Sequence, residues 1–545
     1  MRGHRSFPDI PFRGGERPSS QRGAALVIAL LVLVVLSILG MAFITISKTE
    51  SDISYNDRDS ARALYIAEAG LERFKRDLRY DCSYPGITNT SITDRYLASP
   101  ASAAQGTTED TTGSYVSGSA PVKRYYDLGS AFALVSSEPP TPSFWNSVSP
   151  VAAYQQTSLN GGNYTLKLAR NGWDDVYVLS TGMVGNRVAR TIEAKYEVKS
   201  LSVWDNAIFG GQGATGMVVN GNVTVAGSVH ILGSGLSSTD IAIDLSGGAK
   251  ILNQYSGISS TLDGKLVQNA AYISGLPGKL RTEFRVKRGL TSIGSGASGV
   301  GESSGYVKGV YTNDGFTGSH ASNVFSDNGM NMKYDLPADL SIPFPPINAG
   351  DPPLSTALDI TASLPSSGGK YKLDSTTPSF SLGPDANGNS IQWNQGTGTL
   401  TISGVVKVNG SLDLAKKNNA VNYSGKGTLY VTGSIYVHDN VLPATALSFP
   451  TTNCLGLIAG GDIELATGGG ESNILTAGAF YAANKVKINK QTQHAGSIVC
   501  NFFDLGSQVP SIYQVPLLAR NLPPGMPGGE RYYFVKTVYW REVTS

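Results

Sequence analysis

The sequence predicts an α+β, mainly β, chain in three parts. A long N-terminal helix that crosses a membrane in its first half is followed by a small antiparallel sheet and then by a right-handed parallel β-helix-like solenoid. Three observations predict this order: an uncharged apolar run that continues into an amphipathic segment, three alternating segments over 161–198, and a nine-residue pattern that recurs after residue 220. Glycine is abundant at 64 residues and charged residues make up only 15%, which is typical of many short strands joined by tight turns.

The apolar run AALVIALLVLVVLSILGMAFITI extends from Ala24 to Ile46 without a charged side chain. About 20 such residues suffice to cross a bilayer as a helix. Residues 1–23 contain five arginines and two acids, and basic flanks stay on the cytoplasmic side, so the rest of the chain is expected to face outward. A cleavable secretory signal is one alternative, but its apolar core is normally only about 7–15 residues long, shorter than this run. A plain membrane anchor is the other alternative, but its helix would end at the membrane edge.

The helical pattern continues beyond the membrane edge. In DRDSARALYIAEAGLERFKRDL (57–78), apolar side chains recur three and four positions apart and so share one helical face. These are Leu64, Ala67, Leu71, Phe74 and Leu78. We therefore predict one helix over 24–78, about 80 Å long at 1.5 Å per residue. Its transmembrane part, 24–46, suits lipid, and its second half suits a protein surface.

A head with loops and a small sheet is predicted over 79–200. Residues 79–160 are rich in Ser, Thr, Ala and Pro, which predicts loops. The segments GGNYTLKLARNG, DVYVLSTGMVGN and RVARTIEAKYEV alternate apolar and polar residues and are separated by turns, which predicts a three-stranded antiparallel meander. Because an exposed apolar stripe on the helix is unfavourable, we expect this sheet to cover it.

Internal repetition predicts the solenoid over 201–508. The repeats are VTVAGSVHI (223–231), VKVNGSLDL (406–414), LYVTGSIYV (429–437), LIAGGDIEL (457–465), FYAANKVKI (480–488) and SIVCNFFDL (497–505). Each alternates apolar residues around a central Gly or Asn, which we expect at a corner with positive φ. In a β-helix, stacking of successive coils would bury the inward side chains. The alternative interpretation of the repeats is a series of β-hairpins in a sandwich.

Two proline-rich stretches interrupt or end this pattern. SIPFPPINAGDPP (341–353) predicts a lateral loop or a strap across the solenoid. Residues 509–545 leave the repeat, and RYYFVKTVYW predicts one terminal strand after a proline-rich tail.

No catalytic constellation stands out. The sequence has no G-x-S-x-G, P-loop or H-E-x-x-H motif. Three carboxylates of the repeats fall between inward apolar positions, so we expect them to face solvent rather than form an active site: Asp413, Asp462 and Glu464. GPDANGNSIQ (383–392) has oxygen ligands at calcium-loop spacing but lacks the following glycine and the final glutamate, which favours a hairpin turn.

The remaining special residues also favour structural roles. Three cysteines are too few for a disulfide framework: Cys454 and Cys500 either pair in an oxidising periplasm or stay as buried thiols, and Cys82 is free or bonded to another chain. Three tryptophans could stack on sugar rings, but we expect packing roles for them: Trp173, Trp204 and Trp393. The net charge of +2 gives no reason to expect a nucleic-acid partner.

QRGAALVIALLVLVVLSILG, followed by KTESDISYNDRDSARALYIAEAGLERF, resembles the N-terminal segment of PilX-type minor pilins of the type IV pilus. The resemblance covers the leader and the N-terminal helix. It implies that residues 1–23 are a leader, that a prepilin peptidase cleaves between Gly23 and Ala24, and that the new N-terminus at Ala24 is methylated. Major pilins carry glutamate at the fifth mature position. Here that position is Ile28, as is common in PilX-like and GspK-like members, which favours a minor subunit.

The leading hypothesis is a non-enzymatic pilus assembly protein without a cofactor or metal. It is expected to reside in the inner membrane with a single span and its C-terminal part outside, and then at or near the pilus tip, where it helps initiate assembly. Expected partners are the major and minor pilins, the prepilin peptidase and the inner-membrane assembly platform. Alternatives are a pilus-mounted adhesin that binds a surface glycan through the β-helix, a minor pseudopilin of type II secretion, and a β-helical polysaccharide enzyme.

Overall fold

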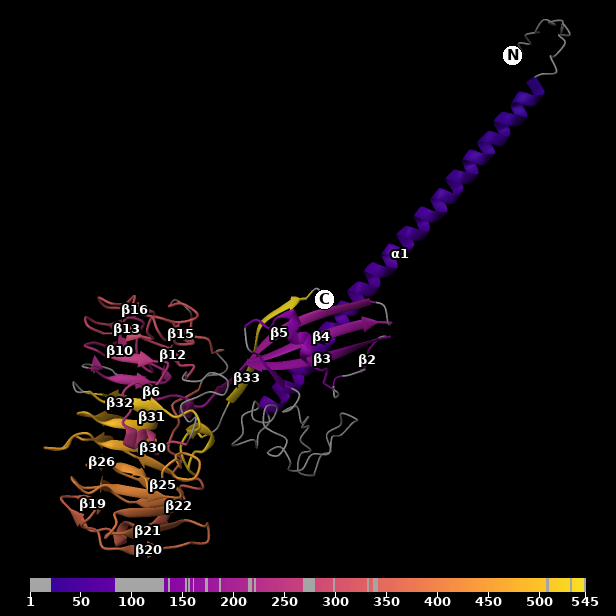
Figure 1. Cartoon of the computed structure of the whole chain (residues 1–545). Coiled ribbons are helices and arrows are strands. Elements are labelled where there is room, and N and C mark those ends of the chain that lie inside the picture. Colours follow the sequence, from indigo (N-terminus) through magenta and orange to yellow (C-terminus); the bar gives the residue numbers. More distant parts are fainter. Residues whose placement is uncertain are drawn as a thin grey trace, which may run out of the picture.

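The computed structural model describes residues 21–83 and 132–543, apart from internal gaps. The gaps are at 136–137, 152–153, 155–156, 160, 172–174, 186–187, 214–217, 220–221, 268–279, 298, 331–332, 337–341, 506–508 and 530–531. A long helix, a small sheet on its second half and a large, mainly parallel sheet beside that sheet make up the molecule (Figure 1). The loops predicted before residue 160 lie largely outside the described residues.

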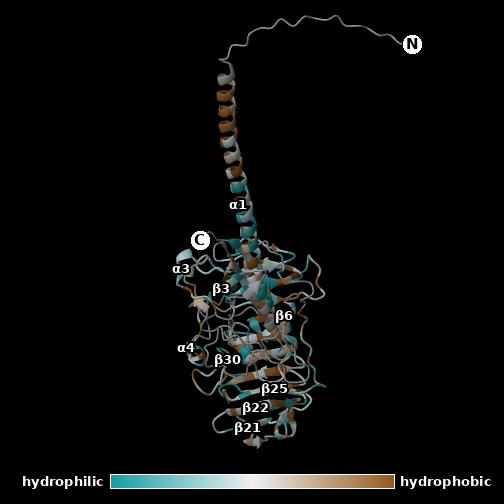
Figure 2. Cartoon of the chain, turned by 90° about the vertical axis from the view of Figure 1, so that its right-hand side faces the viewer, coloured by the Kyte–Doolittle hydropathy of each residue, from teal (hydrophilic) through white to brown (hydrophobic). Residues whose placement is uncertain are grey.

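Helix α1 (Gln21–Ser83) is continuous and confirms the predicted single helix, which extends a few residues past the predicted end. Its first part projects away from the rest of the chain, and the hydrophobic residues gather there (Figure 2). The hydroxyls of Ser37 and Thr45 donate hydrogen bonds of 2.8 and 2.9 Å to the carbonyls of Leu33 and Met41. Polar groups within the apolar run are therefore satisfied by the helix itself, as a lipid environment requires.

The small sheet has the strand order β1-β3-β4-β5-β33, with β2 also beside β3. Its strands are β1 (Phe132–Leu134), β2 (Thr157–Leu159), β3 (Gly162–Asn171), β4 (Asp175–Val184), β5 (Val188–Leu201) and β33 (Tyr532–Glu542). Antiparallel pairing of β3 with β4 and of β4 with β5 confirms the predicted meander.

The second half of α1 packs on this sheet and buries the predicted stripe. Leu71, Phe74 and Leu78 are at most 5% exposed and belong to one apolar cluster with side chains of β3, β4 and β5. Ile66 also belongs to this cluster, although it was not among the predicted residues three and four positions apart, and Leu64 is only half-buried at its edge. Short helix α3 (Pro142–Ser147) covers the opposite face with Trp145.

The terminal strand β33 completes the small sheet from the far end of the sequence. It runs antiparallel to β5, with Tyr532 directly opposite Leu201, and lies beside β5 in Figure 1. The predicted terminal strand is thus confirmed. Residues 202–531 are inserted between two neighbouring strands of the head.

The inserted region begins with the 3-10 turn η3 (Val203–Asp205) and a first group of strands, between which α4 (Ser260–Asp263) lies. This group is β6 (Ile208–Gly213), β7 (Val218–Val219), β8 (Thr224–Ala226), β9 (Val229–Ile231), β10 (Ile241–Leu245), β11 (Lys250–Leu252), β12 (Glu283–Val286), β13 (Leu290–Ile293), β14 (Gly299–Val300), β15 (Gly309–Thr312) and β16 (Phe316–Thr317).

A second group of strands follows a long connection over 318–357. It is β17 (Leu358–Asp359), η4 (Thr361–Ser363), β18 (Ser366–Ser367), β19 (Lys370–Leu373), β20 (Phe380–Leu382), β21 (Ser390–Asn394), β22 (Thr399–Val408), β23 (Ser411–Leu414), β24 (Val421–Ser424), β25 (Lys426–Val431), β26 (Ile435–Val437), β27 (Val441–Pro443), β28 (Cys454–Ala459), β29 (Ile463–Leu465), β30 (Leu475–Ile488), β31 (Gln493–Asp504), β32 (Ser511–Gln514) and η5 (Leu518–Arg520). The parallel sheet therefore continues past the predicted boundary at 508.

Parallel pairing in the second group follows the repeats. Val408 pairs with Val431, Val431 with Ala459, Ala459 with Ala482, and Ala482 with Cys500, which are 23, 28, 23 and 18 residues apart. The sheet closes around one apolar core, in which Leu429 and Phe480 are fully buried. Right-handed β-helix geometry stays a prediction.

The order of strands in space differs from the order in the sequence. Val225 of the first repeat pairs with Ile251 and Ile512, so this repeat does not stack on the repeat that contains Val408. The last strands, β31 and β32, lie against the first ones, β6 and β8. The chain thus enters the stack in its middle, reaches one end at β16, crosses to the other end and returns (Figure 1).

The central glycines of the repeats form a stacked corner. The amides of Gly433, Gly461 and Asn484 each donate to the carbonyl of the central residue one repeat earlier, at 2.8–3.2 Å. Among the central glycines, Gly227 and Gly410 have a positive φ, whereas Gly433 and Gly461 do not, so the predicted reason for glycine is confirmed at the first two positions and wrong at the other two. A Cβ on Gly433 would lie 2.5 Å from the Ser411 hydroxyl, so close stacking of turns requires glycine there.

Candidate functional site: the N-terminal helix

The outer half of α1 is a bare apolar cylinder. Every large hydrophobic side chain from Leu26 to Ile46 is between 45% and 70% exposed, and none of this stretch is buried against the rest of the chain. The helix is long and apolar enough to cross a membrane. Because exposed apolar area costs about 25 cal/mol per Å², this surface must be covered by lipid or by other apolar helices.

The predicted processing site lies at the start of this cylinder. Gly23 and Ala24 both fall within α1, and Ala24 is exposed. Ile28 is 64% exposed, so the fifth position after the predicted cut presents an apolar side chain and no carboxylate. Cleavage and methylation stay predictions.

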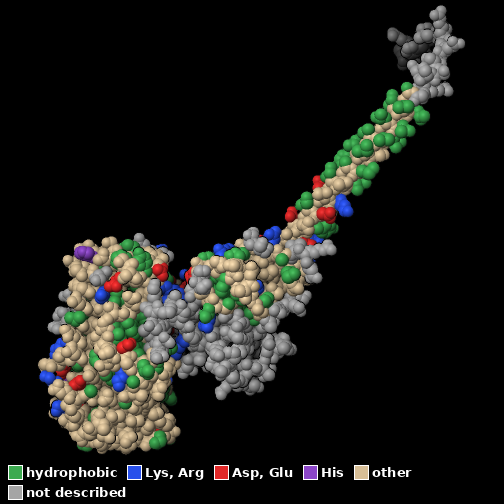
Figure 3. All heavy atoms as spheres, in the orientation of Figure 1, with side chains coloured by type: hydrophobic (Ala, Val, Ile, Leu, Met, Phe, Trp, Pro, Cys, Tyr) green, Lys and Arg blue, Asp and Glu red, His purple; other side chains and the backbone are tan. Residues whose placement is uncertain are grey.

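After the apolar run, the next charged residue is Lys48, between the apolar cylinder and the head, and Figure 3 shows acidic and basic side chains gathering at this level of the helix. The Arg58 guanidinium lies 4.9 Å from the Tyr55 ring centre and 3.8 Å from the Asp59 carboxylate. These residues are mainly exposed, which suits a segment standing in water.

The head is locked to α1 by close backbone contact. A Cβ on Gly182 of β4 would lie 2.1 Å from the Ala63 carbonyl oxygen and 2.5 Å from the Ala67 nitrogen. The Ser180 hydroxyl donates a 2.8 Å hydrogen bond to the Ala67 carbonyl. Small residues on both elements therefore bring the helix unusually near to the sheet.

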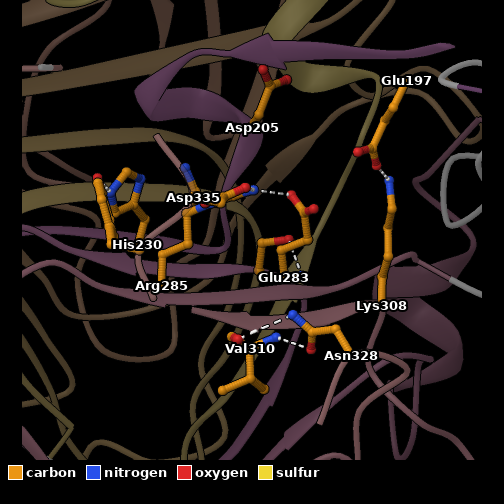
Figure 4. A network of polar contacts seen from close by, with 12 residues as sticks. Glu197, Asp205, His230, Glu283, Arg285, Lys308, Val310, Asn328 and Asp335 are labelled. Atoms are coloured by element: carbon orange, nitrogen blue, oxygen red, sulfur yellow. Dashed lines mark hydrogen bonds and ion pairs between the residues drawn. The ribbon is translucent and has the colours of Figure 1, made fainter. Parts of the chain in front are cut away.

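Buried charges join the head to the inserted region. The Arg281 guanidinium lies 2.9 Å from the Asp175 carboxylate, which also contacts the Lys195 ammonium at 3.3 Å. A second pair, Lys308 with Glu197 at 2.5 Å, crosses the same junction (Figure 4). All five side chains are at most 18% exposed, so these pairs are only weakly screened by salt.

A third buried cluster anchors the connection between the two groups of strands. Arg285 of β12 donates to both oxygens of Asp335, at 2.9 and 3.1 Å, and to Glu283 at 2.6 Å (Figure 4). His230 of β9 lies 2.6 Å from the Tyr334 hydroxyl. Burial, reinforced by the Arg285 charge, lowers the pKa of His230 to about 3, so this imidazole is neutral at ordinary pH.

Two comparisons bear on this geometry. Residues 22–72 match the family model "PilX N-terminal". The N-terminal segment is therefore similar to that of PilX proteins. The match covers the bare apolar half of α1 and most of its head-packed half, and it confirms the predicted resemblance to a type IV minor pilin.

A solved structure extends the likeness to the whole architecture. The competence-associated pilin ComZ from Thermus thermophilus shares the fold with a TM-score of 0.51 and 19% sequence identity, over 90% of this chain and 98% of that one. A search of curated proteins finds no match. At this level of identity the match shows a shared fold over most of this chain and nearly all of that one.

The three carboxylates of the repeats that were expected to face solvent lie in different surroundings. Asp462 accepts hydrogen bonds from the Asn484 side chain at 2.6 Å and the Lys485 amide at 3.2 Å. Asp413 is not simply solvated, because it lies 3.5 Å from the Lys370 ammonium and 3.3 Å from His438 Nε2. Glu464 lies in register with Tyr436 on the same face and is half-buried.

One ionic cluster beside Asp413 has no recognisable signal in the sequence. His438 Nδ1 lies 2.7 Å from Glu471, whose other oxygen accepts from the Gly468 amide at 2.8 Å. A single histidine and a loop glutamate separated by 33 residues form no recognisable motif. The cluster holds the loop that follows β29 against the sheet.

Two further structural predictions, the turn at Asp385 and the packing role of the described tryptophans, are confirmed. Asp385 accepts the amides of Asn387 and Asn389 at 2.8 and 2.9 Å, which makes a turn between the antiparallel strands β20 and β21. Trp204 and Trp393 are 1% exposed and pack in the core, whereas Trp173 lies outside the described residues.

The two cysteines that could have paired are buried free thiols. Burial raises the pKa of Cys500 to about 12, and that of Cys454 well above its usual value. Both are therefore inert, protonated thiols in the core. Cys82 belongs to the last turn of α1.

Proposed function

We propose that this chain is a minor pilin at or near the tip of a type IV pilus, where it helps initiate assembly. The observation that carries the proposal is the division of one continuous helix into a bare apolar half and a half buried on a sheet. The bare half would enter the membrane first and a bundle of pilin helices later. The missing carboxylate at Ile28 favours a minor subunit.

The inserted region supports a terminal position. It spans residues 202–531 and stands beside the head, so it widens the subunit well beyond the helix and its sheet (Figure 1). A filament that repeated this subunit at short intervals would have to accommodate that body at every step. One copy at the end meets no such restriction.

The proposed sequence of events begins in the inner membrane, with the region after the span outside. The prepilin peptidase cleaves between Gly23 and Ala24, Ala24 is methylated, and the assembly platform transfers the helix into the filament. Exposure of Ala24 at the helix surface is compatible with this processing. No catalytic role is assigned to the chain.

The inserted region is proposed to be a right-handed parallel β-helix. Parallel pairing at separations of 18–28 residues and the stacked corner at Gly410, Gly433 and Gly461 support it. Each coil would bury its inward apolar residues only against its neighbours. An adhesive role for the outer face of this body, on a glycan or another surface, is the secondary proposal, and a type II secretion pseudopilus remains the alternative assembly.

Placement of an epitope tag tests the position in the filament. Gly388 lies in the β20–β21 turn at the far end of the inserted region, and an added side chain there would meet nothing within 4 Å. With a tag after Gly388, immunogold labelling is expected only at pilus ends. Labelling along the shaft would refute the tip position, and a mature protein that retains Met1 would refute processing.

A further inference from the structure

A cleft opens where two proline-rich segments meet on the side of the parallel sheet. One wall is formed by residues 342–354 of the connection between the strand groups, and the other by residues 525–529 of the tail that leads to β33. The cavity measures about 670 Å³, within the range of ligand-binding clefts. Neither the helix nor the junction with the head supplies its lining, apart from Val203.

The walls of the cleft are held by the body of the domain. The Trp204 indole donates a 2.8 Å hydrogen bond to the Pro527 carbonyl, and the Tyr481 hydroxyl donates to the Pro345 carbonyl at 2.5 Å. A Cβ on Gly528 would lie 2.9 Å from Pro345, so the two walls approach each other closely at these residues. The cleft is therefore preformed, and a ligand would lose little affinity to ordering it.

The lining offers acceptors, apolar surface and one negative charge. Six of its fifteen residues are prolines, which have no backbone N–H to donate. Ile342, Leu354 and Met526 are apolar lining residues that are only 5–6% exposed. Asp351 is the one ionisable lining residue, is exposed, and has no ion-pair partner in the described part of the chain.

We propose that this cleft binds a basic side chain, lysine or arginine, presented by a partner protein. The aliphatic stem would lie along the proline rings and Met526, and the cation would meet the Asp351 carboxylate and the Asn348 amide oxygen. Lysine and arginine combine such a stem with a charged end that only donates hydrogen bonds, which complements this lining. The site lies on the inserted region and does not depend on a position in a filament.

Methyl NMR on the full chain in a neutral detergent tests the proposal. The chain has seven methionines, and the Met526 methyl signal is assigned by its loss in Met526→Leu. The probes are blocked single amino acids: Nα-acetyl-lysine N-methylamide, its arginine counterpart, and norleucine, which keeps the stem without the charge. We expect the lysine or arginine probe to shift the Met526 signal with a Kd on the order of 1 mM, and norleucine to bind more weakly.

Two charge variants separate the site from general electrostatics. Asp351→Asn is expected to weaken the basic probe about two- to fivefold, the upper part of the range for one exposed ion pair. Glu464→Gln removes one charge from the same domain away from the cleft and is expected to leave binding unchanged. Equal binding of norleucine, equal weakening by Glu464→Gln, an unmoved Met526 signal, or preference for blocked tryptophan would each overturn the proposal. Unchanged thermal melting of both variants ensures that a loss of binding is not a loss of fold.

Discussion

Replacing Gly182 by alanine tests whether close contact between α1 and the sheet holds the head together. The new Cβ would lie 2.1 Å from the Ala63 carbonyl oxygen, whereas ordinary contact begins at 3.4 Å, so helix and strand must separate by about 1.3 Å (3.4 minus 2.1 Å). Both obstructing groups, Ala63 O and Ala67 N, belong to the backbone and cannot rotate away. A gap of about 0.5–1 Å already removes a quarter to a half of the dispersion energy of the atoms that face it.

We therefore expect Gly182→Ala to destabilise the helix–sheet contact by about 3 kcal/mol, at the upper end of the usual cost of overpacking. Hydrogen exchange of the β4 amides in the full chain measures this directly, and protection should fall about 100-fold. The matched control is Gly40→Ala in the bare half of α1, where an added Cβ meets nothing within 4 Å. If β4 protection in Gly182→Ala stays within threefold of the wild type, the contact is not as tight as the geometry requires.

Three further predictions concern the head, the insertion and pH. Replacing residues 202–531 by Asn-Gly should leave a folded head, because Leu201 and Tyr532 lie directly opposite and suit a two-residue hairpin turn; loss of the β-sheet circular dichroism signal would contradict this. Phe74→Ala should destabilise the head by about 3–5 kcal/mol, because the Phe74 ring is fully buried and its centre lies 5.8 Å from that of the Tyr154 ring. The loss is measured as reduced hydrogen-exchange protection, and a loss below about 1 kcal/mol would contradict the prediction. Burial lowers the pKa of His494 to about 3, so between about pH 6.5 and 3 the unfolded state binds a proton that the folded state does not, and the free energy of unfolding should fall as pH drops through this window. His494→Leu should make the free energy of unfolding, measured by urea titration, depend less steeply on pH. An unchanged pH dependence would refute the role of His494.

Local periodicity was sufficient to predict the helix and the meander. The spacing of Leu71, Phe74 and Leu78 reports which helical face is buried, and alternation in β3 to β5 reports which strand face is buried. Neither signal depends on distant residues. Close approach at Gly182 is different, because a glycine in a strand does not reveal which backbone lies above it.

Distant partners could not be predicted. The repeat around Val225 carries the same alternation as the repeat around Val408, so the pattern marks both as core strands without saying that Ile512 is the neighbour of Val225. The pairing of β33 with β5 could not be predicted for the same reason, because the local sequence of two strands more than 300 residues apart does not indicate which residues face each other. Inward-facing residues follow from the sequence, whereas the order of strands follows from the tertiary fold.

The way in which the inserted region is attached restricts its motion relative to the head. A domain tied to its neighbour by one linker is free to reorient, and that freedom is the usual expectation for two domains in one chain. Here both ends leave from adjacent strands, β5 and β33, and two buried ion pairs, Asp175 with Arg281 and Glu197 with Lys308, bridge the same junction. Removing one partner of such a pair leaves an uncompensated buried charge, so the joint resists rotation. A ligand bound on the inserted region would therefore be held in a fixed orientation to α1, and a load on that ligand would pass through the β5–β33 ladder to the helix.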